Sequence, residues 1–296
     1  MLPLPNSPCP MPRASAARAV LLPWWAGALL AVLCVLPGCV GHGIGGPTAA
    51  QERVQQLRDA GFVPMRHATG GFMLYGLLRP ARGDRAGRLH VYIEGDGYAW
   101  KNTHTPSGDP TPHNDVTLRL AAADPTACAV LYLARPCQYT RDLSPACATK
   151  YWTNARFAPE VISVTNAAID RAKAQTGAQH VVLVGFSGGG AVAVLAAALR
   201  DDVAFLGTVA GNLDHAAWTR LHRLTPLAAS LNPRDAAPRV RLLPQRHLSS
   251  PGDRIMPPGI SAGFCEAVGQ PNACVQAPGV PHGGPWEEAW NYAYGP

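Results

Sequence analysis

A serine in a glycine-rich turn between an apolar strand and an apolar helix constrains this chain most. The run is Val181 to Val184, then Gly185-Phe186-Ser187-Gly188-Gly189, then an Ala/Val/Leu-rich stretch to Leu199. β-Branched runs favour a buried strand, and Ala- and Leu-rich runs favour a helix. Glycines on both sides of the serine keep side chains out of the space where strand and helix nearly touch. The pattern predicts a strand–turn–helix unit with Ser187 on a strained turn.

This Gly-x-Ser-x-Gly context is the one that a nucleophile elbow requires, because it exposes a serine hydroxyl at the top of a sheet. A purely structural strand–turn–helix connection has the same residues, and it stays open as an alternative. Gly188-Gly189-Gly190 is not a phosphate-binding loop, since the Gly-Lys-Ser/Thr ending is absent.

The first 38 residues have the pattern of a bacterial secretion signal. Arg13 and Arg18 precede an apolar run from Val20 to Leu36. Leu36-Pro37-Gly38-Cys39 then resembles a lipobox, in which Cys39 is acylated and becomes the mature N-terminus. An ordinary signal peptide or a short membrane anchor is the alternative.

The segment 39–51, rich in Gly, Pro and Ala, is expected to tether the domain to the lipid. We therefore expect a protein of the bacterial cell envelope that faces the periplasm. Val40 stands where an aspartate would favour the inner membrane, which favours the outer membrane here. Met1 and Met11 are both suitable start residues.

The length and charge of the chain favour a single globular domain that spans residues 52–296. Removal of residues 1–38 deletes two arginines and no acids, so the net charge falls from +6 to +4. The charges are scattered without a Lys/Arg run, which gives nucleic-acid binding no support. The length that remains suits a single large α/β domain.

Four cysteines lie in two close pairs, Cys137 with Cys147 and Cys265 with Cys274. An oxidising compartment permits disulfides, and we expect these two. Free thiols are the alternative, because spacing does not prove connectivity. The spacings match no zinc template, and no metal or cofactor is expected.

Apolar runs alternate with helical segments along the chain, which is the signature of a mostly parallel sheet with helices on both faces. Residues 212–238 are a Leu/Ala-rich helical excursion, the usual place for a small lid-like insertion. The expected strands are 62–66, 71–79, 89–94, 127–134, 181–184, 203–209, 240–247 and 273–277, and the expected helices are 115–123, 160–173, 189–199 and 286–294.

This order of elements resembles the α/β-hydrolase superfamily from about Phe72 to the C-terminus. At finer grain, Tyr92-Ile93-Glu94-Gly95-Asp96-Gly97 and the elbow are similar to a group of proteobacterial lipoprotein hydrolases. The resemblance implies an α/β-hydrolase fold, with serine, acid and histidine in that order along the chain.

A serine hydroxyl needs a base to take its proton and a third group to orient that base. His282, in Val280-Pro281-His282-Gly283-Gly284, follows the last expected strand, where the resemblance places the base. His215, His222 and His247 also follow Ser187. The first two lie in the excursion, and the third lies in or at the end of a strand.

Two aspartates compete for the role of the acid. Asp253 follows the strand before His282, in Gly252-Asp253-Arg254-Ile255-Met256-Pro257, and is the preferred candidate. Asp214 follows the strand that ends at Val209, and some relatives place the acid there. Either aspartate also suits a helix cap or a turn.

The expected oxyanion donors are the backbone N–H groups of Gly188 and Asp96. Many relatives have His-Gly at the second turn, whereas this chain has Glu94-Gly95-Asp96-Gly97, which leaves the support of the loop open. A carboxylate that faced the oxyanion would repel it. We therefore expect the Asp96 side chain to point away or to bind a cationic substrate group. Gly-Asp-Gly also suits a plain tight turn.

Four aromatic residues lie in loops on the same expected edge of the sheet. They either line an acyl or aromatic pocket or pack the domain, and the sequence leaves both open. They are Tyr98, Trp100, Tyr151 and Trp152.

Together these features predict a lipid-anchored serine hydrolase that cleaves a carboxylic ester or related acyl bond of a small molecule, with Ser187 acylated and no cofactor. A peptidase or amidase would use the same residues. The alternative from another class is a non-catalytic α/β-hydrolase-like envelope lipoprotein that binds a ligand or partner, because a fold does not establish an activity.

Overall fold

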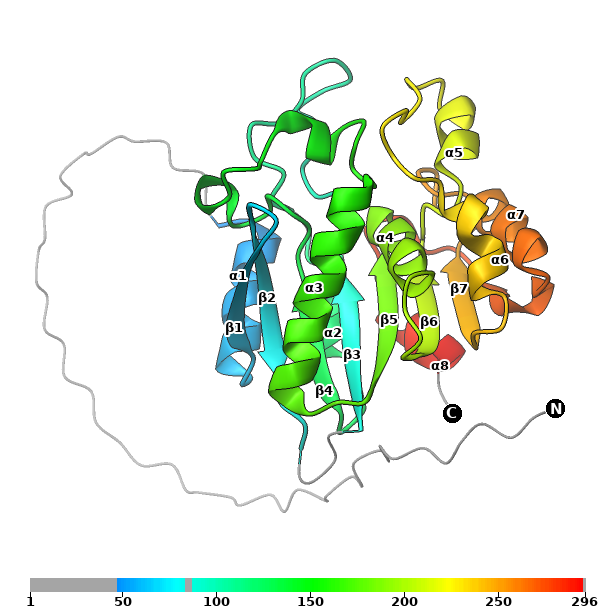
Figure 1. Ribbon diagram of the computed structural model, residues 1–296. Helices are drawn as coiled ribbons and strands as arrows, with labels where there is room; N and C mark the ends of the chain where they lie inside the picture. Colours follow the sequence, from blue (N-terminus) through cyan, green and yellow to red (C-terminus); the bar gives the residue numbers. More distant parts are fainter. Residues whose placement is uncertain (1–46, 83–86, 295–296) are drawn as a thin grey trace, which may run out of the picture.

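The computed structural model describes residues 47–82 and 87–294. Their strands form one eight-stranded sheet, with helices around it (Figure 1). The strand order is β1-β2-β4-β3-β5-β6-β7-β8. β2 is antiparallel to its neighbours β1 and β4, and every other pairing is parallel. The strands are β1 (Val63–Thr69), β2 (Phe72–Arg79), β3 (Arg88–Ile93), β4 (Ala129–Leu133), β5 (His180–Phe186), β6 (Val203–Val209), β7 (Gln245–Ser249) and β8 (Cys274–Gln276). The expected mostly parallel sheet is confirmed.

Helices cover both faces of this sheet (Figure 1). One face packs against α1 (Ala49–Asp59), α2 (Val116–Ala122) and α8 (Glu287–Tyr294). The other packs against α3 (Pro159–Thr176), α4 (Gly188–Ala197), α6 (Ala237–Val240) and α7 (Pro258–Val268). α5 (His215–Leu221) lies in the excursion 212–238, beyond the carboxyl ends of the strands. Short 3₁₀ turns are η1 (Arg141–Leu143), η2 (Thr149–Trp152), η3 (Pro233–Ala236) and η4 (Pro271–Ala273).

Alternate residues of the central strands enter two separate cores. In β5, Val181 and Leu183 belong to the core under α3 and α4, whereas Val182 and Val184 belong to the core under α2 and α8. Successive side chains of a strand point to opposite faces of the sheet. A strand covered on both faces therefore needs an unbroken apolar run, and the sequence has one here.

The first helix begins inside the segment expected to be a tether. Thr48 Oγ1 accepts a hydrogen bond from Gln51 N at 3.3 Å, and Gln51 Oε1 accepts one from Thr48 N at 2.8 Å. This capping box starts α1 at Ala49, so residues 49–51 are helical. Residues 39–46, the expected signal 1–38 and Cys39 lie outside the described residues.

The predicted strand 240–247 is wrong in its first half. Residues 237–240 form α6, and β7 begins only at Gln245. Pro238 has a fixed φ that suits the first turn of a helix, and Val240 is buried in that helix while Leu242 is 85% exposed. Pro244 directly precedes the strand. The alternating apolar residues of this segment resemble a strand, but they belong to a helix and a turn.

Both predicted disulfides are present. Cys137–Cys147 closes a loop in the irregular segment between β4 and α3, and Cys265–Cys274 joins α7 to β8. Among residues 47–82 and 87–294, no helix combines the length and apolarity needed to cross a membrane.

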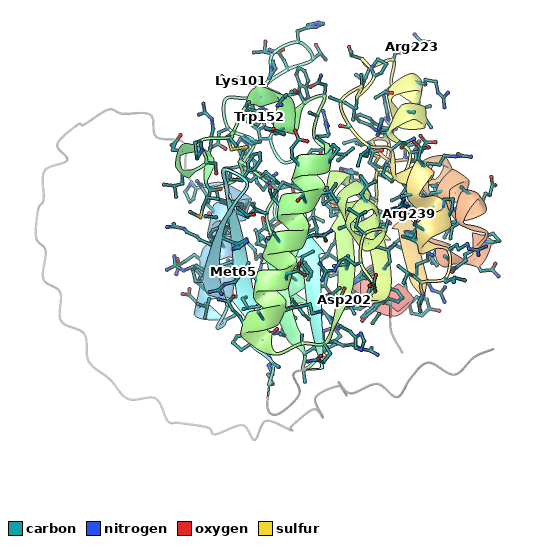
Figure 2. The ribbon with its side chains drawn as sticks, in the orientation of Figure 1. Met65, Lys101, Trp152, Asp202, Arg223 and Arg239 are labelled. Atoms are coloured by element: carbon teal, nitrogen blue, oxygen red, sulfur yellow. A yellow bond between two sulfur atoms is a disulfide. The ribbon has the colours of Figure 1, made fainter. Side chains whose placement is uncertain are left out.

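The parallel strands all end at the same edge of the sheet, and the long loops gather beyond that edge. Figure 2 shows Lys101, Trp152 and Arg223 at this end of the molecule, while Asp202, directly before β6, lies toward the opposite end. Ligands of open α/β sheets bind outside the carboxyl ends of the strands. The candidate site is therefore expected there.

Candidate active site

Ser187 alone forms the turn between β5, which ends at Phe186, and α4, which begins at Gly188. Its φ of 52° and ψ of −122° lie in a region that L-residues seldom adopt. The turn is held from the neighbouring strand: Ser187 N donates to Val209 O at 3.0 Å, and Ser187 O accepts from Asn212 N at 2.9 Å. These bonds fix a strained serine at the carboxyl edge of the sheet.

Two glycines make this turn possible. A Cβ on Gly185 would lie 2.2 Å from Gly189 O, and a Cβ on Gly189 would lie 2.2 Å from Ile93 O. Both distances are too short for a non-bonded contact. Alanine at position 185 would therefore push β5 and α4 apart, and alanine at position 189 would push α4 and β3 apart. The glycine spacing in the sequence has this steric cause.

His282 and Asp253 complete a hydrogen-bonded chain to the serine. His282 Nε2 lies 3.1 Å from Ser187 Oγ, and His282 Nδ1 lies 2.7 Å from Asp253 Oδ2. With the imidazole proton on Nδ1, the serine hydroxyl donates to Nε2 and Nδ1–H donates to the carboxylate. The His282 side chain is 18% exposed, whereas the Asp253 side chain is fully buried. This arrangement suits a base that reaches substrate and an acid that does not.

The two candidate acids have different surroundings. Asp253 Oδ1 accepts from Ile255 N at 2.8 Å and Met256 N at 2.9 Å, which leaves Oδ2 for His282. Asp214 instead caps α5: its Oδ1 accepts from Ala216 N and Ala217 N. The structure therefore brings Asp253, and not Asp214, to the histidine.

The other histidines after Ser187 make different contacts. His222 Nε2 bonds to Ile255 O at 2.9 Å, and His215 packs 6.1 Å from the Phe157 ring. His247 is fully buried in β7 with Nδ1 2.9 Å from Thr208 Oγ1, and burial lowers its pKa to about 3. A histidine that is neutral and sealed in this way serves packing.

The two expected oxyanion donors, the backbone N–H groups of Gly188 and Asp96, stand in adjoining turns beside Ser187. Gly188 is the first residue of α4, so its N–H has no intrahelical acceptor. The turn after β3 passes directly over the elbow, because a Cβ on Gly95 would lie 3.4 Å from Ser187 Cβ. Gly97 has a φ of +66°, and a Cβ there would lie 2.0 Å from Pro110 O. Asp96, the second expected donor, lies between these glycines.

A buried carboxylate, that of Glu94, supports this turn. Glu94 is 1% exposed and accepts from Gly95 N at 2.8 Å, from Thr117 Oγ1 at 2.7 Å and from Tyr132 OH at 2.9 Å. Gln138 Nε2 adds a bond to Gly95 O at 3.0 Å. Burial raises the pKa of Glu94 above its usual value, although these hydrogen bonds oppose the shift.

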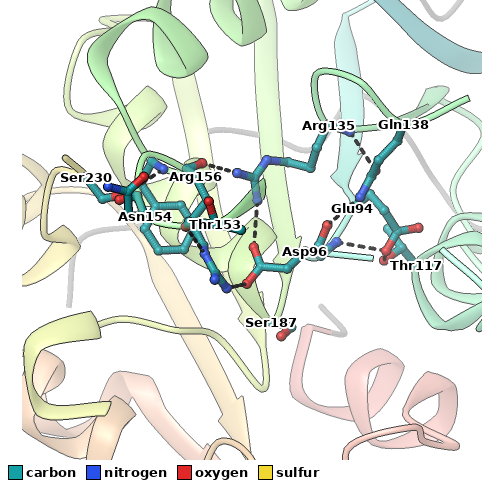
Figure 3. Close-up of polar contacts among 12 residues, drawn as sticks. Glu94, Asp96, Thr117, Arg135, Gln138, Thr153, Asn154, Arg156, Ser187 and Ser230 are labelled. Atoms are coloured by element: carbon teal, nitrogen blue, oxygen red, sulfur yellow. Dashed lines mark hydrogen bonds and ion pairs between the residues drawn. The ribbon is translucent and has the colours of Figure 1, made fainter. Parts of the chain in front are cut away.

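The Asp96 side chain pairs with two arginines. Its carboxylate accepts from Arg156 Nη1 at 2.6 Å and from Arg135 Nη1 at 3.3 Å, so its cationic partners belong to this chain (Figure 3). Sequence reasoning missed both arginines. Arg135 lies two residues after β4, which placed it at the active edge, but nothing local marked it as a partner of Asp96.

Three of the four aromatic residues have packing contacts. Tyr98 stacks on His113 at 4.2 Å, Tyr151 meets the Phe72 ring edge-on at 5.0 Å, and buried Trp152 donates to Ser107 O. Trp100 is 40% exposed. Among the described residues there is no group of three or more His, Cys, Asp or Glu side chains that could hold a metal ion.

No family model matches this chain, and no curated protein matches it in sequence. Its structure is similar to Est1E from Butyrivibrio proteoclasticus, with a TM-score of 0.54 at 16% identity over 78% of this chain and 95% of that one. XC6422 from Xanthomonas campestris, an α/β serine hydrolase without lid, gives 0.51 at 15% identity over 78% and 93%. The esterase domain of a Rhodothermus marinus protein gives 0.52 at 17% identity over 78% and 93%. The chain has the α/β-hydrolase fold.

Proposed function

We propose that this protein is a serine hydrolase that cleaves a carboxylic ester or a related acyl bond through an acyl-enzyme. One observation carries the proposal: a strained serine hydroxyl at the carboxyl edge of the sheet is 3.1 Å from His282 Nε2, and the opposite nitrogen is 2.7 Å from the buried Asp253 carboxylate. A structural turn has no need of such a chain of three groups. The similar esterase domain from Rhodothermus marinus supports the same class.

In the proposed mechanism each group has one role. His282 Nε2 takes the Ser187 proton while Oγ bonds to the substrate carbonyl carbon, and the carbonyl π electrons move to its oxygen. The N–H groups of Gly188 and Asp96 donate to that oxyanion. As the carbonyl re-forms, the C–O bond to the alcohol breaks and His282 returns the proton to the leaving oxygen. Water then releases the acid by the same steps, with His282 as base, and Asp253 stabilises each imidazolium.

A fluorophosphonate probe tests the serine directly, because it reacts only with an activated hydroxyl. We expect the wild type to be labelled and Ser187→Ala to be unlabelled. Ser261→Ala is a matched control, since Ser261 is also buried but lies in α7, outside the site. A folded wild type that takes up no probe would contradict the proposal and favour a binding protein.

The choice between ester and amide needs a second experiment. p-Nitrophenyl esters and p-nitroanilides with the same acyl groups, graded in length, separate the two classes and give the acyl preference. We expect turnover of the esters, because an amide demands a better-placed proton for a poorer leaving group. Faster turnover of the anilides would make the protein an amidase.

We also propose that Cys39 is acylated and anchors the domain to the bacterial envelope, facing the periplasm. The support is the apolar run from Val20 to Leu36 followed by Leu36-Pro37-Gly38-Cys39. In a bacterial host, Cys39→Ala is expected to move the protein out of the membrane fraction, and separation of inner from outer membranes locates the wild type. Unchanged fractionation of Cys39→Ala would exclude the lipid anchor.

A further inference from the structure

The Asp96 carboxylate lies against the first residue of α4. A Cβ on Gly188 would meet Asp96 Oδ1 at 2.1 Å, so the carboxylate occupies the space that any other residue at position 188 would fill. Gly188 supplies one of the two proposed oxyanion donors. The turn that supplies the other donor therefore brings a negative charge to the place where negative charge must develop.

Such a placement creates a conflict. The amino end of a helix attracts anions, because its first N–H groups are unpaired and the helix dipole is positive there. A carboxylate next to Gly188 competes with the substrate oxyanion for the same N–H, and it also repels that oxyanion. An oxyanion site with this neighbour works only if other groups bind the carboxylate and keep it off the Gly188 N–H.

Two buried arginines hold it. Arg156 Nη1 donates to Asp96 Oδ2 at 2.6 Å, and Arg135 Nη1 donates to Oδ1 at 3.3 Å, so both carboxylate oxygens are engaged (Figure 3). The side chains of Arg156 and Arg135 are 6% and 5% exposed, and that of Asp96 is 18% exposed. Two guanidinium groups for one carboxylate leave an excess positive charge beside the oxyanion position.

The arginines are fixed by the segment between η2 and α3. Arg156 Nε donates to Thr153 O at 2.6 Å, and Arg135 Nη2 donates to Arg156 O. The Arg135 guanidinium also lies 5.4 Å from the centre of the Phe157 ring. This segment is bound in turn to the excursion 212–238, since Ser230 Oγ accepts from Phe157 N at 3.1 Å and donates to Asn154 O at 2.8 Å (Figure 3).

We propose that Arg135 and Arg156 are positioning residues that hold the Asp96 carboxylate away from the Gly188 N–H and so keep that N–H free for the substrate oxyanion. The inference rests on the proposed function, which it deepens. It also explains why Gly-Asp-Gly is compatible with an oxyanion turn: the aspartate is an anchor for the loop once its charge is compensated.

The ionisation of Asp96 agrees with this role. Burial acts to raise the pKa of the Asp96 carboxyl, but the Arg156 and Arg135 guanidinium groups outweigh burial and hold the pKa below its usual value. The carboxylate is therefore charged near neutral pH, and it needs its partners there.

Backbone NMR of the ¹⁵N-labelled full chain tests the contact without relying on activity. In Arg156→Gln the Gly188 amide proton is expected to move downfield, because the released carboxylate accepts its hydrogen bond. The Asp96→Asn/Arg156→Gln double variant is expected to reverse this shift. An unchanged Gly188 signal in the folded single variant would overturn the proposal, even if the protein hydrolyses nothing.

Kinetics test the consequence. Arg156→Gln is expected to lower kcat for p-nitrophenyl ester hydrolysis about 100-fold, with a small change in KM, as the loss of one oxyanion donor does. Asp96→Asn in the same chain is expected to restore at least about tenfold of that loss, because it removes the competing charge. A double variant no more active than Arg156→Gln would overturn the proposal.

The matched control is Arg200→Gln. Arg200 is a similarly buried arginine, 7% exposed, that pairs with Asp170 and Asp202 at the other end of the sheet. It is expected to lose stability like Arg156→Gln and to keep kcat. An equal fall of kcat in both variants would mean that a buried arginine matters only for folding, which would also overturn the proposal. An inert wild type that resists the fluorophosphonate probe would instead refute the proposed function, and the Gly188 signal would still decide the contact.

Discussion

Two aspartate–histidine pairs in the described part of the chain have the same Nδ1–Oδ2 distance. His282 Nδ1 lies 2.7 Å from Asp253 Oδ2 at the carboxyl edge of the sheet, and His90 Nδ1 lies 2.7 Å from Asp124 Oδ2 among β3 and the loop before β4. Only the first pair touches a serine. An aspartate–histidine pair becomes a candidate site when the second ring nitrogen of the histidine reaches a nucleophile.

The two pairs differ in what surrounds them. The His282 side chain is 18% exposed and its second nitrogen meets Ser187 Oγ, whereas the His90 side chain is 2% exposed and its ring meets the Tyr294 ring edge-on at 5.9 Å. Both His282 and Asp253 stand in loops, while His90 lies within β3. A strand holds a side chain inside a core, and a loop beyond the strand ends presents it to substrate.

The carboxylate of the His90–Asp124 pair also accepts more hydrogen bonds than that of Asp253. Asp124 accepts from Tyr92 OH at 2.9 Å and from Thr126 N and Oγ1 at 2.9 and 2.6 Å in addition to His90. Burial opposes ionisation, but the hydrogen bond and charge of His90 and the bonds from Thr126 lower the pKa of Asp124 to about 2. The hydrogen bonds of this pair stabilise the fold, whereas in the other pair His282 Nε2 contacts Ser187.

Exchanging the histidine of each pair for asparagine separates them most strongly. His282→Asn is expected to lower kcat for ester hydrolysis roughly 10⁶-fold, since the base is lost. His90→Asn is expected to leave kcat unchanged and to lower the melting temperature. Steady-state kinetics and thermal unfolding of both variants check this. Activity loss in a folded His90→Asn would show that the two pairs are not functionally separate.

The aspartate of the candidate site gives the next largest effect. Asp253→Asn keeps the shape of the side chain but is expected to lower kcat roughly 10⁴-fold, because His282 loses its orienting charge and preferred tautomer. Asp214→Asn, at the cap of α5, serves as the control and should keep kcat. The reverse result would assign the acid to the earlier strand.

Asp124→Asn probes the second pair through stability. Removal of the charge leaves Arg79 and His90 buried without their carboxylate, which is expected to cost about 3 kcal/mol of unfolding free energy. Urea unfolding measures the change. Asp170→Asn, whose side chain is 63% exposed in its pair with Arg200, should cost less than about 1 kcal/mol. Equal losses in the two variants would contradict the role given to burial.

The smallest effect is a pH dependence. Because the pKa of Asp124 falls from 3.8 to about 2 on folding, its ionisation stabilises the folded state above pH 4 and this stabilisation disappears as the pH falls toward 2. The wild type is expected to lose about 2 kcal/mol over this interval that Asp124→Asn does not lose. Denaturant unfolding from pH 5 to 2 checks it, and parallel curves for the two proteins would contradict it.

Most of the sheet was predictable because its strands are local apolar runs. The segment 240–247 was not, because Val240 and Leu242 alternate like a strand while Pro238 and Pro244 favour a helix followed by a turn. The partners of Asp96 were not predictable either. Arg135 and Arg156 are 39 and 60 residues away in the chain, and no periodicity connects them to the turn.

The sequence by itself determined the strand–turn–helix at Ser187, because the steric exclusion between Gly185 and Gly189 acts within five residues. It also named His282, which follows the last strand. Only the tertiary structure decided that Asp253 lies beside that histidine while Asp214 caps α5, and that the Asp96 carboxylate turns to Arg135 and Arg156. Steric exclusion between neighbouring residues can be predicted from the sequence. Charge pairing depends on distances in space, which only the folded chain sets.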